Sequence, residues 1–277
     1  MTTVTPTDSD TFTRDWADWH RRREEALSDP HGFLAVTGLH WLTPQPQRFP
    51  DAPGQWHTDE NVVVVTLGDG EAITVAGRRV TGRHTFGPIA ERGGGVVGVD
   101  GGVVEIARRG GRDILRPRRP DHPLRVAHRG TPAYPPTPQW VLTGRYVPFD
   151  VPRPTTVGAA VEGLEHVYDA PGRIEFALDG LPLSLTAFDG IAPGSLSVLF
   201  TDTTAGVTTY PAVRSLAVAA PDEHGLVTLD FNRATNLPCA YTDFATCPLP
   251  PAENRLPVAV EAGEKLPYER QSPSAQS

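Results

Sequence analysis

The sequence lacks several features that identify common classes of protein. No apolar run approaches the ~18 residues that cross a bilayer as a helix, and the first residues, MTTVTPTDSD, have neither the basic start nor the apolar run of a secretory signal. These absences predict a cytoplasmic protein with no membrane partner. The formal net charge of −8 over 277 residues also predicts no nucleic-acid partner, because phosphate recognition needs a basic surface.

Lysine is nearly missing, because Lys265 is the single lysine among 25 basic residues. This bias is typical of GC-rich genomes and suggests an actinobacterial source. A lysine that remains in such a sequence is a candidate for a role that needs an amine. The arginines that gather between Arg112 and Arg125 are expected either to lie on a solvated strand edge or to pair with the acidic excess within the chain.

Motifs for common cofactors are absent as well. The chain has no phosphate loop, no G-x-S-x-G nucleophile elbow and no H-E-x-x-H pair, and ERGGGVVGVDGG fits hairpin turns better than a dinucleotide fingerprint. The nine histidines are dispersed, and the nearest pair, His122 and His128, is expected on one strand. We therefore expect no cofactor and no metal, although a metal site built from distant strands stays open.

Cysteine is scarce, with only Cys239 and Cys247. Their spacing is wrong for a zinc knuckle, and in the cytoplasm thiols are expected rather than a disulfide. Whether the two pair stays open. Cys239 as a nucleophile is the weaker alternative to a packed thiol, because no histidine is near in sequence.

The patterns that are present predict a mainly β fold. SDTFTRDWADWHRRREEALSDP predicts an amphipathic helix at about residues 11–28, with Phe12, Trp16, Trp19 and Leu27 on one side. After it, about a dozen short strands separated by turns such as Asp179-Gly180 predict an antiparallel barrel or sandwich, with the N-terminal helix packed against it. We expect one domain over residues 11–268, with disordered ends at 1–10 and 269–277.

The segment LDFNRATNLPCAYTDFATCPLPPAENRL, residues 229–256, does not fit a regular element. It combines three asparagines, both cysteines and several prolines. Proline removes backbone donors, and asparagine side chains compete with regular structure for hydrogen bonds. This segment is expected to be an ordered loop, serving either as a functional site or as a structural brace.

The C-terminal motifs carry a resemblance to a known family. TDTTAGVTTY, Arg214, LDFNRATNLPCAY, TCPLPPAENRL and AGEK occur in this order, and GFLAVTGLHWL and RPRRPDHPLRVAHRG look like its more variable parts. Together they resemble the bacterial and archaeal family called domain of unknown function 1684, from about residue 14 to 266. The resemblance implies no activity. Pro211, Val213 and Leu237 depart from its pattern.

The family signature falls on a set of polar, ionisable and thiol side chains. These are Asp202, Thr204, Tyr210, Arg214, Asp230, Asn232, Asn236, Cys239, Cys247, Asn254, Arg255, Glu264 and Lys265.

The ionisable groups in this set suggest an enzyme without a cofactor. It would carry out acid–base chemistry, namely hydrolysis, elimination or isomerisation, on a small polar or anionic organic molecule. The proposed catalytic residues are Tyr210, Asp230, Glu264 and Lys265, with Asp230 or Glu264 as base and Tyr210 or Lys265 as acid. The proposed substrate-binding residues are Arg214, Asn232, Asn236 and Asn254, with Arg214 holding the anion.

Two other functions remain open. One is a non-catalytic β-barrel protein that binds a small molecule in a mostly apolar cavity. The other is a scaffold or interaction protein without a pocket, in which the asparagines and arginines bond to the backbone. The sequence does not specify the substrate or the oligomeric state.

Overall fold

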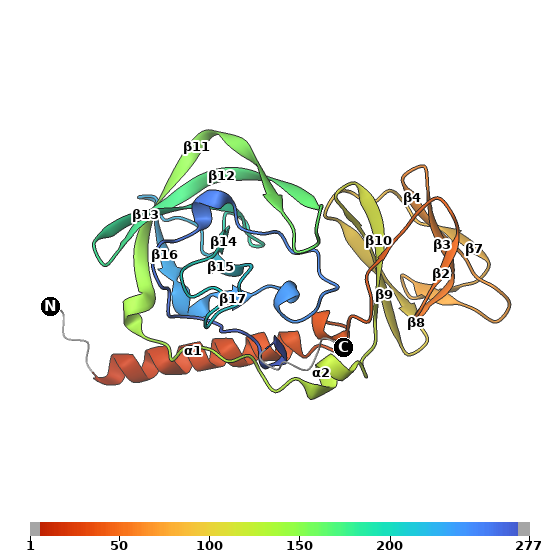
Figure 1. Cartoon of the computed structure of the whole chain (residues 1–277), viewed down its shortest axis with the longest axis horizontal. Helices are drawn as coiled ribbons and strands as arrows, with labels where there is room; N and C mark the ends of the chain where they lie inside the picture. Colours follow the sequence, from red (N-terminus) through yellow and green to blue (C-terminus); the bar gives the residue numbers. More distant parts are fainter. Residues whose placement is uncertain (1–5, 271–277) are drawn as a thin grey trace. The chain divides into compact units, whose positions relative to one another are not determined.

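The computed structural model describes residues 6–270 and is mainly β (Figure 1). The chain divides into two compact units. Within the described residues, unit 1 comprises 6–25, 130–241 and 247–270, and unit 2 comprises 26–129 and 242–246. Compactness does not establish independent folding, so the single domain expected over residues 11–268 stays a prediction. Residues 1–5 and 271–277, in the two ends expected to be disordered, lie outside the described residues.

Unit 2 contains two antiparallel sheets. The six-stranded sheet has the order β1 (His40–Trp41), β10 (Arg112–Arg118), β9 (Gly102–Arg109), β8 (Gly94–Val99), β5 (Ile73–Val75), β6 (Arg78–Val80). The four-stranded sheet has the order β2 (Gln47–Phe49), β3 (Ala52–Asp59), β4 (Val62–Thr66), β7 (Arg83–Thr85). Trp56, Val65 and Ile73 belong to one buried cluster that both sheets supply, as expected of a sandwich.

Unit 1 is built on a seven-stranded antiparallel sheet. Its order is β16 (Leu226–Asp230), β11 (Val141–Gly158), β12 (Glu165–Leu178), β13 (Leu181–Asp189), β14 (Leu196–Phe200), β15 (Arg214–Val218), β17 (Thr235–Asn236). Asp179 and Gly180 join β12 to β13 with φ values of 52° and 80°, the left-handed turn that the Asp-Gly pair predicts. Phe200, Leu216 and Phe231 lie in the core cluster of this unit.

The N-terminal helix α1 (Pro6–Leu27), most of which belongs to unit 1, packs within that unit through its half-buried side. The Trp16 Nε1 donates to the Asn232 carbonyl oxygen at 2.8 Å, and Arg23 Nη2 donates to the Asn236 carbonyl oxygen at 2.8 Å. Figure 1 shows α1 alongside β17 and the blue C-terminal segment. The helix begins at Pro6, earlier than the predicted residue 11. The sequence did not indicate this earlier start, because the first turn is polar and has no apolar periodicity.

These elements confirm the predicted fold class, a mainly β chain of antiparallel sheets with an N-terminal helix packed against it. Between the two alternatives the sandwich fits, because no sheet in the described part of the chain closes into a barrel. Among residues 6–270, no helix combines the length and the apolar character needed to cross a membrane.

The short helices mostly lie in the connections. They are η1 (Phe33–Ala35), α2 (Pro123–Ala127), η2 (Pro138–Trp140), η3 (Phe231–Arg233), η4 (Pro238–Ala240), η5 (Ala252–Asn254) and η6 (Tyr268–Arg270). The expectation that His122 and His128 lie on one strand is wrong, because the helix α2, with Pro123 in its first turn, separates them. Of the segment 229–256 expected to be an ordered loop, Leu229 and Asp230 end β16, and residues 231–256 form irregular structure with short 3-10 turns and the two-residue β17.

Candidate functional site

Arg214 starts β15 and is fully buried, with 1% of its surface exposed. Its Nη2 lies 2.6 Å from Asp202 Oδ2, and its guanidinium also donates to the carbonyl oxygens of Ala262 and Val260. Burial lowers the pKa of Arg214, while Asp202 opposes that shift. This guanidinium already holds a carboxylate of its own chain, which favours the structural account of Arg214.

Two of the three asparagines hold loops together. Asn254 accepts from Thr186 N at 2.7 Å and donates to the carbonyl oxygens of Thr186 and Leu199, both at 2.8 Å. Asn232 accepts from Thr137 N at 2.9 Å and donates to the Thr137 carbonyl oxygen at 3.0 Å. Asn254 therefore takes the place of a strand neighbour for Thr186 in β13 and Leu199 in β14. Asn232 binds the backbone of Thr137, just before η2, so both buried amides are satisfied by backbone groups.

Glu264 lies at the centre of a second buried cluster. Its Oε1 accepts from Arg23 Nε at 3.0 Å, and its Oε2 accepts from Asn236 N at 2.6 Å and from the Tyr241 hydroxyl at 3.3 Å. Burial and then the charge of Glu264 raise the pKa of Tyr241. Asn236 donates from its amide to the Lys265 carbonyl oxygen at 2.8 Å. The carboxylate thus joins α1 to the segment after β17.

The remaining predicted residues are dispersed. Lys265 Nζ lies 4.3 Å from the centre of the Tyr134 ring, a cation–π contact. Asp230 caps η3 by accepting from Asn232 N at 3.2 Å, and its other oxygen is 3.1 Å from Arg233 Nε. Tyr210 is half-buried beside Cys239, and burial, followed by that thiol, raises its pKa.

The structure therefore brings together only part of the predicted set. Arg214 and Asn236 are partners in the pairing of β15 with β17. Glu264 and Lys265 are near them because both accept hydrogen bonds from Asn236. Tyr210 and Asp230 were expected to meet if the strands next to them were neighbours, but β15 and β16 are not hydrogen-bonded neighbours in the sheet. The catalytic and substrate-binding roles stay predictions.

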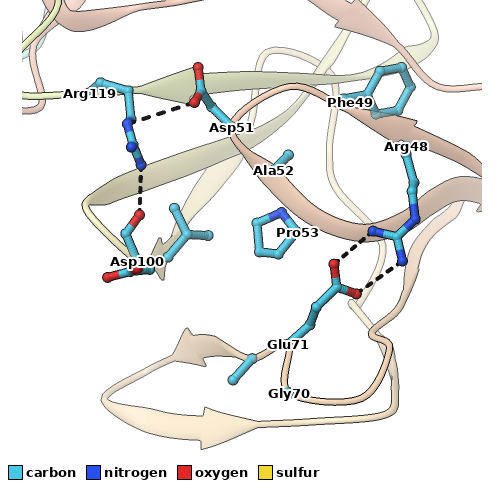
Figure 2. Close-up of a pocket in the computed structure, with 11 residues that line it drawn as sticks. Arg48, Phe49, Asp51, Ala52, Pro53, Gly70, Glu71, Asp100 and Arg119 are labelled. Carbon is cyan, nitrogen blue, oxygen red and sulfur yellow. Dashed lines mark hydrogen bonds and ion pairs between the residues drawn. The ribbon is translucent and has the colours of Figure 1, made fainter.

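A pocket of about 420 Å³ opens in unit 2, and sequence reasoning did not identify it. It lies between the start of β3, the loop before β5 and the β8–β9 turn (Figure 2). Its charged lining residues are Arg48, Asp51, Glu71, Asp100 and Arg119, and its other lining residues are Phe49, Ala52, Pro53, Gly70, Ala72 and Val99. This volume suits a small organic molecule.

The two arginines of the pocket differ in how firmly they are held. Arg48 makes a two-pronged contact with Glu71, at 2.7 and 3.3 Å, and lies apart from Arg119 in Figure 2. Arg119 donates to the Asp100 carbonyl oxygen at 2.7 Å, but its Nε is 3.7 Å from Asp51 Oδ1. Arg119 and Asp51 both line the pocket and are each about one-third exposed, with only a loose contact between their charges.

Glu71 lines the pocket and is held in place by several hydrogen bonds. The hydrogen bond from Arg48, followed by one from Gly68 N, lowers the pKa of Glu71 to about 2. Its oxygens also accept from Gly54 N at 3.2 Å. The only signal for this region in the sequence is turn chemistry, since Gly68-Asp69-Gly70 and Asp100-Gly101 both mark turns that place these charges.

Metal ligands do not gather in the described part of the chain. Across residues 6–270, no group of three or more histidine, cysteine, aspartate or glutamate side chains is placed to hold a metal ion. Of the arginines between 112 and 125, Arg116 and Arg118 pair closely with an acidic residue, since Arg116 Nη2 lies 2.6 Å from Glu105 Oε1 and Arg118 contacts the same carboxylate. Arg112 instead lies over the Trp41 ring, and Arg125 donates to the backbone carbonyl oxygens of Ser28, Asp29 and Pro120. The charges of Arg116 and Arg118 lower the pKa of Glu105 against the effect of burial.

The fold and these contacts define a mainly β protein whose C-terminal loops are fixed by buried asparagines and ion pairs. The model of the family described as "Protein of unknown function (DUF1684)" matches residues 126–265, half of the chain, and the chain belongs to this family. The matched residues lie inside the range expected from the resemblance.

The chain also matches solved structures. One of them, a solution NMR structure of an uncharacterized protein from Haloarcula marismortui, is 30% identical, with 49% of this chain and 76% of that chain covered and a TM-score of 0.42. No curated protein matches the chain significantly.

Proposed function

We propose that this protein binds a small organic molecule that carries both an anionic and a cationic group, in the pocket of unit 2. The observation that supports this proposal is the loose contact between Arg119 and Asp51, two charged residues that line the pocket. Arg119 supplies donors suited to a carboxylate or phosphate, and Asp51 and Asp100 supply acceptors for an amine. A ligand with both charges would replace the 3.7 Å contact by closer ones.

This proposal follows the binding alternative, in a pocket more charged than the apolar cavity expected for it. Arg48 is excluded from the ligand-binding set, because Glu71 already engages it through both oxygens. Catalysis on the bound molecule is not part of the proposal. The acid–base groups predicted from the sequence belong to unit 1, where Glu264 accepts three hydrogen bonds from its own chain.

A thermal-shift screen tests the proposal. Wild-type protein is heated with amino acids, simple carboxylates, simple amines, phosphates and sugars, because a ligand of the native state raises the melting temperature by mass action. We expect amino acids, or other molecules with both charges, to stabilise most. At a concentration 100 times its Kd, a ligand adds about 2.7 kcal/mol.

Three variants locate the binding. Arg119→Gln and Asp51→Asn should each remove the stabilisation by the ligand. Arg83→Gln is the matched control, because Arg83 forms an exposed pair with Asp59 at 3.9 Å in the same unit but does not line the pocket. If no compound stabilises wild type, or if the Arg119 and Asp51 variants respond as the control does, the proposal is wrong.

A further inference from the structure

The two cysteines of the chain lie side by side in unit 1. Cys239 N donates to Cys247 Sγ at 3.3 Å, and the two side chains are hydrogen-bonded to each other. They are buried, at 3% and 7% exposure, and both are thiols. No other cysteine occurs in the sequence, so two residues eight positions apart account for all its thiol chemistry.

The two residues are in direct contact, as a disulfide between them requires. Cys247 Sγ already lies 3.3 Å from Cys239 N, an atom one bond away from the Cys239 Cα. Cys239 belongs to η4 and Cys247 lies in irregular structure, so the connection between them contains no strand or long helix that a new bond would have to distort.

The surroundings of Cys239 favour its thiolate. The hydrogen bond with Cys247 lowers the pKa of Cys239 most, burial opposes it, and the Tyr210 hydroxyl and the Arg270 charge lower it further. The Arg270 guanidinium is held beside the thiol, because it donates to the carbonyl oxygens of Cys239 and Ala240 at 3.4 and 3.3 Å. The thiolate is the nucleophilic form of cysteine, and a neighbouring arginine favours it.

The site also lies near solvent. Tyr210 and Arg270 are only half-buried, and Pro211, next to Tyr210, is exposed. Two of the groups beside Cys239 are therefore partly exposed to solvent. A packed core thiol would instead lie among apolar groups, with no hydroxyl or guanidinium beside it.

We propose that Cys239 and Cys247 form a redox-active dithiol that reduces a hydroperoxide. The Cys239 thiolate attacks the terminal peroxide oxygen, so that an S–O bond forms and the O–O bond breaks. The leaving alkoxide takes up a proton and departs as the alcohol. Cys247 then attacks the Cys239 sulfenic acid, forming the S–S bond and releasing water. The two thiols lose two electrons and the hydroperoxide gains them.

The first experiment uses the whole reduced protein and hydrogen peroxide. After timed exposure, thiols are counted with an aromatic disulfide reagent in denaturant, and the intact mass is measured. We expect both thiols to disappear together, with loss of two hydrogens, no covalent dimer and full recovery with dithiothreitol. Thiols that persist in excess peroxide, or a disulfide between two molecules, would overturn the proposal.

Variants then assign the two roles. Cys247→Ser should stop at a sulfenic acid on Cys239 that dimedone captures, whereas Cys239→Ser should leave Cys247 unmodified over the same time. Equal capture by the two variants would contradict the assignment of Cys239 as the attacking thiol. Each variant only exchanges sulfur for oxygen, so both are expected to fold. Circular dichroism checks this separately from the chemistry.

Tyr210→Phe tests the positioning of the thiolate. It keeps the ring but removes the hydroxyl that stabilises the Cys239 thiolate. The midpoint of the pH–rate profile for peroxide consumption should therefore move to higher pH, with a slower rate at neutral pH. A purely structural role for Tyr210 would change the melting temperature and leave that midpoint in place.

Discussion

Single buried side chains hold the C-terminal loops in place through hydrogen bonds and ion pairs, and Arg214 is the clearest example. Arg214→Ala would leave the Asp202 carboxylate buried without its cation, a change that costs about 3–5 kcal/mol in buried pairs. We expect the free energy of unfolding in urea to fall by that amount. The variant should also melt lower than wild type without any ligand present.

Arg173→Ala is the matched control for Arg214→Ala. Arg173 pairs with Glu175 at 2.7 Å on the same sheet, but these two side chains are 40% and 46% exposed. Exposed pairs contribute ~0.2–1 kcal/mol, so this variant should unfold almost as wild type does. If Arg214→Ala proved as mild as the control and also lost binding of an anion, Arg214 would be a binding residue.

Residue roles in this protein were harder to predict than residue types. The sequence indicates that Asn232, Asn236 and Asn254 are ordered and polar, and it leaves open whether they bind a ligand or the backbone. The partners decide this, and Thr137, Thr186 and Leu199 lie 95, 68 and 55 positions away from the asparagines they bind. No local pattern encodes such distant contacts.

Among the elements, the long pair formed by β11 and β12 approaches most closely at Gly172. A Cβ on Gly172 would lie 2.5 Å from the Val147 carbonyl oxygen and 2.6 Å from the Tyr146 ring. We expect Gly172→Ala to lower the free energy of unfolding by about 1–3 kcal/mol, as overpacking does. In the same strand pair, Gly158→Ala would meet only Leu249 Cδ1 at 3.5 Å and should change stability by less than about 0.5 kcal/mol. Equal effects would show that backbone entropy, not crowding, decides the outcome.

The loop between β4 and β5 depends on the ionised form of Glu71. The folded-state pKa of about 2 lies below the ordinary 4.5, so the unfolded chain binds the proton more readily. This contribution to stability is complete above pH 4.5 and is lost as the pH falls through about 2. Glu71→Gln should therefore be less stable than wild type at pH 7, and the difference should shrink as the pH falls toward 2.

Urea unfolding at a series of pH values measures this difference. The control is Glu175→Gln, which breaks an exposed ion pair and should cost little at pH 7. A gap between wild type and Glu71→Gln that stays constant from pH 7 to pH 3 would mean that the shape of the side chain, not its charge, fixes the loop.

Elements were more predictable than the pocket they form. Alternation, glycine punctuation and Asp179-Gly180 indicate the strands and hairpins because these signals are local. The pocket takes charges from β2, from the loop before β5, from the β8–β9 turn and from beyond β10, so the sheet order creates it. Sheet order results from long-range pairing, which period-2 patterns do not specify.

At the scale of the whole molecule, the net charge leads to the last prediction. The arginine-rich stretch 112–119 is the part that could contradict the exclusion of nucleic acid. Arg116 is 3% exposed in its contact with Glu105, and Arg118 contacts the same carboxylate, so neither presents a free charge to phosphate.

Because the protein has a net charge of −8, labelled duplex DNA at ~0.15 M salt should show no rise in fluorescence anisotropy up to a protein concentration of ~0.1 mM. Binding that weakens steeply as salt increases would contradict this prediction. Arg112→Gln, which changes an exposed arginine at the start of β10, would then show whether that strand end contacts the phosphates.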